Sequence, residues 1–488
     1  MTELVLGLDQ GTSSTRCLAF DHDLRQRGAA AVPIDTSFPG PGLVEQNPDE
    51  LLASARSAIE GALASAGARL ADVVALGIAN QTETFIVAER KSARPVHPAI
   101  VWQDRRTAAR CAELAAAGHA PWVRERTGLE LDATFPATKV AWVLDHVPGA
   151  RPAAEAGELV YHDVGGWLVR HLAGVEACEV GNAGRTLLCR LGGERWDDAL
   201  LDLFEVPRPM LAPIVDSDAI GALGPGAEFP VTGVLGDQQA SLFGLGCRAP
   251  GAAKVTLGTG AFILAQAGAT PPAPPPRVHA ACAWRTRSET SFALEGFVPA
   301  AGAALDWFAG IGVLPPGAEL DALLTAAGPE EDSAIACVPA LQGLGTPSWD
   351  PAARAALIGL SRATTRAQIA QAVIDGVLHQ AADALEAISA VMPLAAVLLD
   401  GGMSRSDWIV RRLAEIARVR VERSARPEAT AIGASMMAGL AAGFWGGVDE
   451  LPGVETDLVC EPSWSASEWE ARRERWAAAV AVAAGWPG

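Results

Sequence analysis

The chain has 488 residues, half of them hydrophobic, and a formal net charge of −19 at pH 7. A chain of this length exceeds what one hydrophobic core can serve and suits two large domains. Its acidic balance argues against nucleic acid and against anionic membrane surfaces as main partners, because both bind basic protein faces.

Eight cysteines are scattered along the chain without a CxxC pair or a metal-ligand spacing. This usage is typical of reduced, buried thiols in a cytoplasmic protein. The first apolar run has no basic segment before it, so no signal peptide is expected. The longest weakly polar stretch near the end, 434–448, is too short and too rich in glycine to span a bilayer. We therefore expect a soluble cytoplasmic protein.

An apolar run from residue 4 reaches Asp9, turns through 10–14 and resumes as a second apolar run. This pattern predicts a β-hairpin with a tip of small residues. Gly11 lets a bulky anion approach the backbone, and successive amides form an anion-binding concavity. Asp9 would repel a bare phosphate but would hold a magnesium ion that bridges to one. The phosphates of a nucleotide therefore fit the tip, and an ordinary N-terminal hairpin is the alternative.

The next elements alternate between helices and buried strands. A helix is expected over 48–66, with Asn47 as its N-cap and a proline in its first turn. A buried strand follows at 73–79, and a strand beginning at residue 99 breaks into a charged helix start. The region 121–201 reads as mostly helical.

Polar residues gather just past these strands. In open α/β sheets, ligands lie beyond the carboxyl ends of the strands. Glu83 and Trp102 are therefore candidates for a pocket. Packing of an aromatic ring at the sheet edge is the competing interpretation for Trp102.

Asp237 stands where an apolar strand gives way to a helix, at an expected N-cap position. The helix dipole favours an ionised carboxylate there. An ionised aspartate that faces a cleft can accept a proton from a substrate hydroxyl. A plain capping aspartate is the alternative.

The stretch 253–265 repeats the opening design, with a Gly258-Thr259-Gly260 turn between two apolar runs. Two such hairpins suggest two similar halves, each supplying a phosphate loop to a shared cleft. The proline-rich segment 271–276 should be a surface loop.

The second half is expected to contain a helix over 294–307, a loop over 343–347 and a long helix over 366–391. Residues 396–406 form an apolar strand, a glycine turn and a helix start, which suits the flat approach of a base or ribose. A tight turn without function is the alternative. The helix at 465–484 is either a core-packing helix or an oligomer face.

The chain contains no Walker A string, no HExxH and no GxSxG. P-loop, zinc-protease and α/β-hydrolase interpretations therefore lack support.

In this order, the motifs resemble those of the FGGY carbohydrate kinases, and among them the glycerol kinases most. The matching strings are DQGT at 9–12, IVWQ at 100–103, GDQQA at 236–240, GTG at 258–260, GTP at 345–347 and LDGG at 399–402. The resemblance covers nearly the whole chain. It implies two α/β domains, 1–246 and 247–488, of the actin, hexokinase and heat-shock-chaperone type (ribonuclease H-like), with an active cleft between them.

The resemblance also implies roles for single residues. Asp237 would be the general base, and Asp9 and Asp237 would hold Mg²⁺. The phosphates of ATP would contact Gly11, Thr12, Ser13, Ser14, Arg16, Gly258 and Thr259, and its nucleoside would lie near Gly302, Asp306, Gly402 and Ser406. The acceptor would contact Thr82, Glu83, Trp102, Thr134, Asp237, Gln238 and Phe262.

Two positions depart from the glycerol-kinase pattern. Thr82 replaces an arginine, and Thr134 replaces a tyrosine. A guanidinium fork holds a diol rigidly, and such groups set discrimination between substrates. The expected function is ATP-dependent phosphorylation of a polyol or sugar hydroxyl, in a pocket roomier than glycerol needs.

The alternatives are glycerol kinase proper, and a xylulose, ribulose or erythritol kinase. A non-catalytic actin-like ATP-binding protein is less favoured, because Asp9, Asp237 and both Gly-Thr turns are retained. The expected partners are a small sugar or polyol and ATP or ADP, and a homodimer or tetramer is left open.

Some bacterial glycerol kinases bind fructose 1,6-bisphosphate through a glycine-rich loop that ends in arginine. The matching stretch, 224–228, ends in Glu228. We therefore expect no inhibition by this compound.

Overall fold

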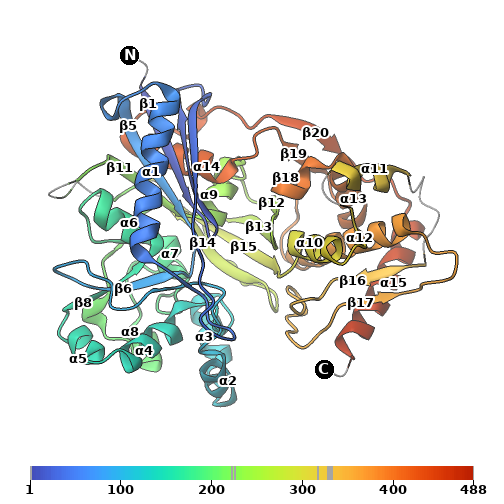
Figure 1. Cartoon of the computed structure of the whole chain (residues 1–488), viewed down its shortest axis with the longest axis horizontal. Helices are drawn as coiled ribbons and strands as arrows, with labels where there is room; N and C mark the ends of the chain where they lie inside the picture. The colour runs from blue at the N-terminus through green and yellow to red at the C-terminus, as the bar shows by residue number, and fades with distance from the viewer. Residues whose placement is uncertain (1–2, 221–223, 225–226, 316–317, 327–333, 487–488) are drawn as a thin grey trace.

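The computed structural model describes residues 3–220, 224, 227–315, 318–326 and 334–486. Two mixed β-sheets organise these residues, one in each half of the chain (Figure 1). The first sheet has the order β11-β5-β1-β2-β3, and its strands are β1 (Leu4–Gln10), β2 (Ser14–Phe20), β3 (Gln26–Pro33), β5 (Val73–Asn80) and β11 (Val231–Gly236). The second has the order β14-β15-β13-β12-β18-β19-β20, and its strands are β12 (Ala252–Leu257), β13 (Ala261–Gly268), β14 (His279–Arg285), β15 (Thr290–Val298), β18 (Ala396–Asp400), β19 (Val421–Ser424) and β20 (Thr456–Cys460).

The two sheets share one design. In the first, β1 pairs antiparallel with β2 and parallel with β5. In the second, β12 pairs antiparallel with β13 and parallel with β18. Both predicted hairpins are therefore present, and so is the expected two-domain α/β fold. The boundary between residues 246 and 247 stays a prediction.

Smaller sheets and the helices surround these two sheets. The small strands are β4 (Glu45–Gln46), β6 (Phe85–Glu89), β7 (Ala99–Ile100), β8 (Leu159–Asp163), β9 (Cys178–Glu179), β10 (Ile214–Val215), β16 (Ala336–Val338) and β17 (Ala356–Ile358). The helices of the first half are α1 (Pro48–Ala66), α2 (Ala108–Ala116), α3 (Ala120–Thr127), α4 (Pro136–His146), α5 (Ala150–Glu155), α6 (Val164–Leu172), α7 (Val180–Gly184), α8 (Asp198–Phe204) and α9 (Asp237–Gly244). Those of the second half are α10 (Gly302–Gly310), α11 (Ala318–Ala326), α12 (Arg366–Ser389), α13 (Asp407–Ala417), α14 (Ala429–Ala442) and α15 (Ala466–Ala484).

Helix α1 shows how local sequence sets an element. The Asn47 side chain accepts a hydrogen bond from the backbone of Asp49, as an N-cap does, and Pro48 opens the first turn. Gly67 ends the helix in the left-handed conformation. The apolar side of α1 packs against β2 and β3. The predicted bounds and cap of this helix are confirmed.

Helix α14 comes from the second half of the chain but covers a face of the first sheet (Figure 1). The strand register aligns Gly7 of β1 with Gly77 of β5 and Gly77 with Gly233 of β11. A Cβ atom on Gly77 would lie 1.9 Å from the carbonyl oxygen of Ala434, and one on Gly7 would lie 2.0 Å from that of Ala431. Because these strand positions lack side chains, the helix backbone rests directly on the sheet.

Three sequence-based expectations need correction. Residues 294–307 are not one helix, because 294–298 belong to β15 and pair with β13, while Leu294 and Glu295 pair with β14 as well, and α10 begins only at Gly302. The mostly helical region 121–201 also contains strands β8 and β9. Gly236 is the N-cap of α9, so Asp237 is the first helical residue instead.

All eight cysteines are buried free thiols, as expected. Among the described residues, no helix is both long enough and apolar enough to cross a membrane. The expectation about the loop 224–228 falls partly outside the described residues. Within that loop, Glu228 pairs with Arg56 at 2.7 and 2.8 Å.

Candidate active site

The carboxyl ends of three parallel strands place the predicted acidic residues at one edge of the first sheet. Gln10 of β1 is in register with Asn80 of β5, which is in register with Gly236 of β11. Asp9 therefore lies one residue before this row, and Asp237 lies one residue after it. The segment that carries Glu83 continues from the same row, so residues distant in sequence meet at one edge.

The Asp237 carboxyl lies in a setting that disfavours its charge. Its Oδ1 accepts a hydrogen bond of 2.8 Å from the backbone of Gln238. Burial raises the pKa of Asp237 to about 6, the negative charge of Glu83 adds to that rise, and the ammonium of Lys254 opposes it. A carboxylate with this pKa is ionised at neutral pH but can still accept a proton.

Asp9 lies close enough to Asp237 for their charges to interact. Burial raises the pKa of Asp9 to about 7, and the charge of Asp237 is the next cause, partly offset by Arg16. The described residues contain no cluster of three or more carboxylate, histidine or cysteine side chains that could hold a metal ion. Mg²⁺ usually binds through one or two carboxylates together with phosphate oxygens and water. Two mutually repelling carboxylates fit that mode, since a cation would relieve the repulsion.

Lys254, on β12, links the second sheet to the residue beside Asp237. Its buried ammonium donates to the Gln238 side-chain oxygen at 2.7 Å and to the Thr256 hydroxyl at 2.8 Å. Burial lowers the pKa of Lys254, while the charges of Asp400 and Asp237 counteract that fall. The sequence prediction missed this residue, although a lysine inside an apolar strand is itself a signal.

The first hairpin tip is tied to the indole of Trp102. The backbone of Gly11 donates to the carbonyl of Ser14 at 3.1 Å, which closes the turn. The carbonyl of Ser13 accepts from the backbone of Ile34. The hydroxyl of Thr12 accepts from the Trp102 indole at 3.0 Å. The structure therefore brings Trp102 to the tip of the first hairpin.

Arg16 lies on β2 and is half exposed. Its guanidinium pairs with the Glu428 carboxylate at 3.0 Å, so it reaches toward the start of α14. Phe262 of β13 packs near Phe297, with ring centroids 5.0 Å apart, and Trp102 lies edge-on to Phe297 at 6.4 Å. Phe297 thus brings two predicted acceptor-site aromatics together.

The second glycine turn packs against the start of α10. The backbone of Gly302 donates to the carbonyl of Gly258 at 2.9 Å, and the backbone of Ala303 donates to that of Thr259 at 3.0 Å. A Cβ atom on Gly302 would lie 2.6 Å from the Gly258 carbonyl oxygen. The predicted phosphate turn and the first predicted nucleoside residue are therefore adjacent.

The remaining nucleoside candidates differ in their surroundings. Gly402 follows the end of β18, which is in register with β12 near the Gly258 turn. The Ser406 hydroxyl caps α13 by accepting from the backbone of Ile409, and it contacts the Asp321 carboxylate. Asp306 is exposed on α10. Ser406 is thus engaged in local structure, and its role in nucleoside binding stays a prediction.

Glu83 has a left-handed backbone with φ of +60°. Its carboxylate accepts from the Thr82 hydroxyl at 2.7 Å and from the Arg185 guanidinium. Arg185 also forms a two-pronged pair with Glu295 at 2.9 and 3.0 Å. The sequence prediction missed Arg185 and Glu295, whose positions give no local hint of a contact with Glu83.

Thr134 lies slightly apart from these groups. Its hydroxyl donates to Asp132 at 2.7 Å, and the Arg105 guanidinium lies 3.4 Å from it. Its neighbour Phe135 packs under the Arg185 guanidinium at 5.4 Å. Thr134 therefore borders the Glu83 region through Phe135.

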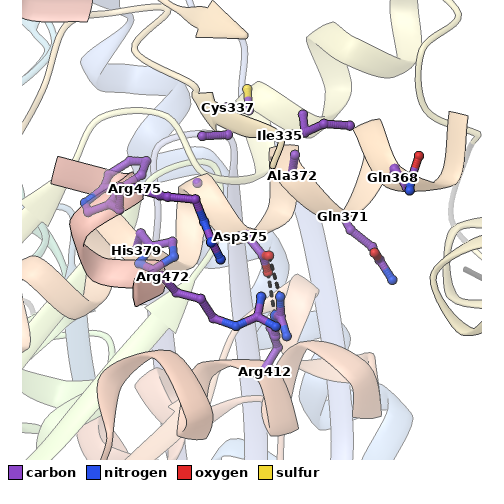
Figure 2. Close-up of a pocket in the computed structure, with 13 residues that line it drawn as sticks. Ile335, Cys337, Gln368, Gln371, Ala372, Asp375, His379, Arg412, Arg472 and Arg475 are labelled. Carbon is purple, nitrogen blue, oxygen red and sulfur yellow. Dashed lines mark hydrogen bonds and ion pairs between the residues drawn. The ribbon is translucent and has the colours of Figure 1, made fainter. Parts of the chain in front are cut away.

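A small cavity in the second half is separate from these residues (Figure 2). Its volume is about 50 Å³, and its described lining comes from α12, α13, α15 and the β16 region. The Arg412 guanidinium closes on the Asp375 carboxylate at 2.6 and 2.7 Å. The residues that line this cavity include none of the predicted site residues.

Comparisons with known proteins identify the family of this chain. Residues 4–244 match the N-terminal domain and residues 253–442 the C-terminal domain of the FGGY family of carbohydrate kinases. The glycerol kinase of Bordetella parapertussis is 42% identical, over 99% of this chain and 98% of its own length. That of Methylobacterium nodulans is 44% identical, over 91% of each chain.

Solved structures share the fold. The crystal structure of Plasmodium falciparum glycerol kinase with ADP superimposes with a TM-score of 0.92 at 24% identity, covering 99% of this chain and 98% of the other. The xylulose kinase from Rhodospirillum rubrum superimposes with a TM-score of 0.84 at 21% identity, covering 98% of each chain.

These findings define a phosphotransferase that uses an alcohol group as its acceptor. The chain belongs to the FGGY family of carbohydrate kinases. Its substrate class is a sugar or polyol.

Proposed function

We propose that this kinase transfers the terminal phosphate of ATP to a hydroxyl of an uncharged polyol, in a pocket open to acceptors larger than glycerol. The observation that carries the proposal is the shared strand edge, which brings Asp9, Glu83 and Asp237 together. The high identity to glycerol kinases supports polyol chemistry.

The charges near the acceptor favour a neutral molecule. Three carboxylates, on Glu83, Glu295 and Asp237, interact with three buried cations, on Arg185, Lys254 and Lys139. Each of these cations is already balanced by a carboxylate, so an aldonate or sugar phosphate would add a negative charge that they do not neutralise. A polyol can instead donate its hydroxyl hydrogens to carboxylates.

The pocket is expected to be roomy because two short side chains stand where larger groups would restrict it. The Thr82 hydroxyl is bonded to Glu83, and the Thr134 hydroxyl to Asp132. Neither side chain projects a guanidinium or phenol toward the acceptor. Hydrogen-bonding groups of a site set much of its discrimination, so fewer of them should broaden the range of acceptors.

In the proposed mechanism, Asp237 accepts the proton of the attacking hydroxyl. Glu83 and Gln238 orient the acceptor, and Lys254 holds the Gln238 side chain. The backbone amides of the two glycine turns bind the phosphates. Asp9 and Asp237 would hold Mg²⁺, which supplies neutralisation of the phosphate charge when bound. Closure of the two halves excludes water from the transferring phosphate.

A coupled assay of ADP release across glycerol, erythritol, ribitol, xylulose and gluconate tests the proposal. We expect release to depend on the acceptor and erythritol or ribitol to give kcat/KM values at least equal to that of glycerol. A clear preference for glycerol would contradict the roomier pocket and leave glycerol kinase proper, which the curated relatives favour. A preference for gluconate would contradict the neutral acceptor, and ATP binding without any turnover would indicate a non-catalytic protein.

A further inference from the structure

Arg185 is a buried cation that the proposed mechanism does not use. It lies at the end of α7, and its guanidinium sits between the carboxylates of Glu83 and Glu295. The exposed fractions of the three side chains are 8%, 6% and 4%. The flanking charges outweigh the loss of hydration and raise the pKa of Arg185 above its ordinary value. The guanidinium therefore stays charged in the described structure.

The backbone around this contact is anchored on both sides. The side chains of Asn80 and Asn182 exchange hydrogen bonds of 2.9 and 3.1 Å. Three residues further along each segment, Glu83 meets Arg185. Helix α7 is thus fastened to the end of β5, and the same segment carries the left-handed Glu83. A left-handed conformation at a residue other than glycine persists only when its surroundings impose it.

Arg185 also connects the two halves of the chain. Glu295 belongs to β15 of the second sheet, and the fork of two hydrogen bonds fixes the plane of the guanidinium. Phe135 packs against the guanidinium from the side of Thr134. The position of the Glu83 carboxylate is therefore set by a cation whose own position depends on both sheets.

We propose that Arg185 is a positioning residue for the acceptor. It holds the Glu83 carboxylate in the orientation that receives the acceptor hydroxyls. Because residue 82 is a threonine, the guanidinium that lies next to Glu83 comes from Arg185 at the end of α7. This inference rests on the proposed polyol-kinase function. In the competing interpretation, this buried ion pair only stabilises the fold. Its loss would then affect the binding of acceptor and nucleotide equally.

The test uses the full-length protein and the variants Arg185→Gln, Arg185→Lys, Glu83→Gln and the double variant Glu83→Gln/Arg185→Gln. Arg412→Gln is the matched control, because it breaks another buried arginine–carboxylate pair, outside the site. For Arg185→Gln we expect the acceptor KM to rise about 30-fold or more, because misplacement of a substrate-positioning group can cost up to about 100-fold. The Kd for ADP should change less than about threefold, since the residues predicted to bind the nucleotide do not include this pair.

The double variant separates positioning from stability. If Arg185 acts through Glu83, adding Arg185→Gln to Glu83→Gln should raise the acceptor KM less than about threefold further. Arg185→Lys keeps the charge without the fork, so it should fold and still show a raised acceptor KM. Arg412→Gln should lower the melting temperature without changing the acceptor KM.

Three results would overturn the inference. They are an unchanged acceptor KM in both Arg185 variants, additive effects in the double variant, and a crystal structure of Arg185→Lys in which Glu83 has not moved. The proposed function fails differently, because then the unmodified enzyme releases no acceptor-dependent ADP. In that case the crystal structure still decides whether Arg185 positions Glu83.

Discussion

Asp237 combines a buried position with a charge that the fold disfavours. Its pKa of about 6 is close to neutral pH, and a general base is most effective when its pKa is close to the working pH. The same burial makes the ionised form costly for the folded chain. Removing the Asp237 charge should therefore lower kcat and raise the free energy of unfolding.

Replacing Asp237 with asparagine should remove the base and keep the side-chain volume. We expect kcat to fall by about 10³-fold, within the range for loss of a general base. The Kd for ADP should stay within about threefold of the original value, measured by titration calorimetry. Asp198→Asn is the control, because Asp198 also opens a helix but forms only an exposed ion pair. Retention of most of the rate would show that another group takes the proton.

The same variant should be more stable than the parent at alkaline pH. The folded state binds the Asp237 proton more tightly than the unfolded state, so the stability of the parent falls as the pH rises from about 4 through 6. Asparagine carries no such penalty, and we expect it to raise the free energy of unfolding by up to about 3 kcal/mol at pH 8. The difference should shrink toward zero near pH 4. Chemical unfolding at both pH values measures it, and a variant less stable at pH 8 would contradict the assignment.

At the scale of elements, the contact between α14 and the first sheet depends on glycine. Gly77→Ala would place a methyl group 1.9 Å from the carbonyl oxygen of Ala434. Either the helix or the strand must shift, and such overpacking usually destabilises a protein by about 1–3 kcal/mol. We expect a loss of that size in the free energy of unfolding. Gly453→Ala should be nearly neutral, because a Cβ atom there meets nothing within 4 Å.

Elements whose signals are local could be predicted from the sequence. The hairpin tips at Gly11 and Gly258 and the capped helix α1 are examples. The helix expected over 294–307 failed because pairing with two neighbouring strands outweighed local propensity. The contact of Arg185 with Glu83 spans 102 residues, and no local pattern predicts such a contact.

The residues of the candidate site also fall into two groups, those that local sequence predicts and those that it does not. Asp9 lies near the end of an apolar strand, and Glu83 and Asp237 follow such strands, so parallel pairing alone places them together. Lys254 and Arg185 reach these residues from other elements, and their partners become visible only in three dimensions. Ser406 shows a further limit, since one hydroxyl can serve as a helix cap and as a predicted ligand contact.

At the scale of the whole molecule, the two sheets are joined by a shared apolar core. It combines Phe20, Phe243, Leu264, Trp284 and Met437, which come from both halves of the chain. Buried ion pairs such as Arg185–Glu295 cross the same interface. Because this core is buried and continuous, the halves should not unfold independently.

Scanning calorimetry should therefore show one unfolding transition, with equal calorimetric and van't Hoff enthalpies. Gly77→Ala is the informative comparison, because it weakens the packing of α14 and should broaden or split that transition. Two separate transitions in the parent protein would indicate that each half is stable without the other.

The packing of α14 against Gly7 and Gly77 also has a consequence during protein synthesis. Residues 4–236 supply every strand of the first sheet, yet the helix that covers one face of it ends only at Ala442. A nascent chain must therefore extrude nearly its whole length before that face is closed. During this interval the apolar surface is open to misassembly, as in other large proteins that fold domain by domain. Fragments that stop before residue 429 should accordingly depend on chaperones to remain unaggregated.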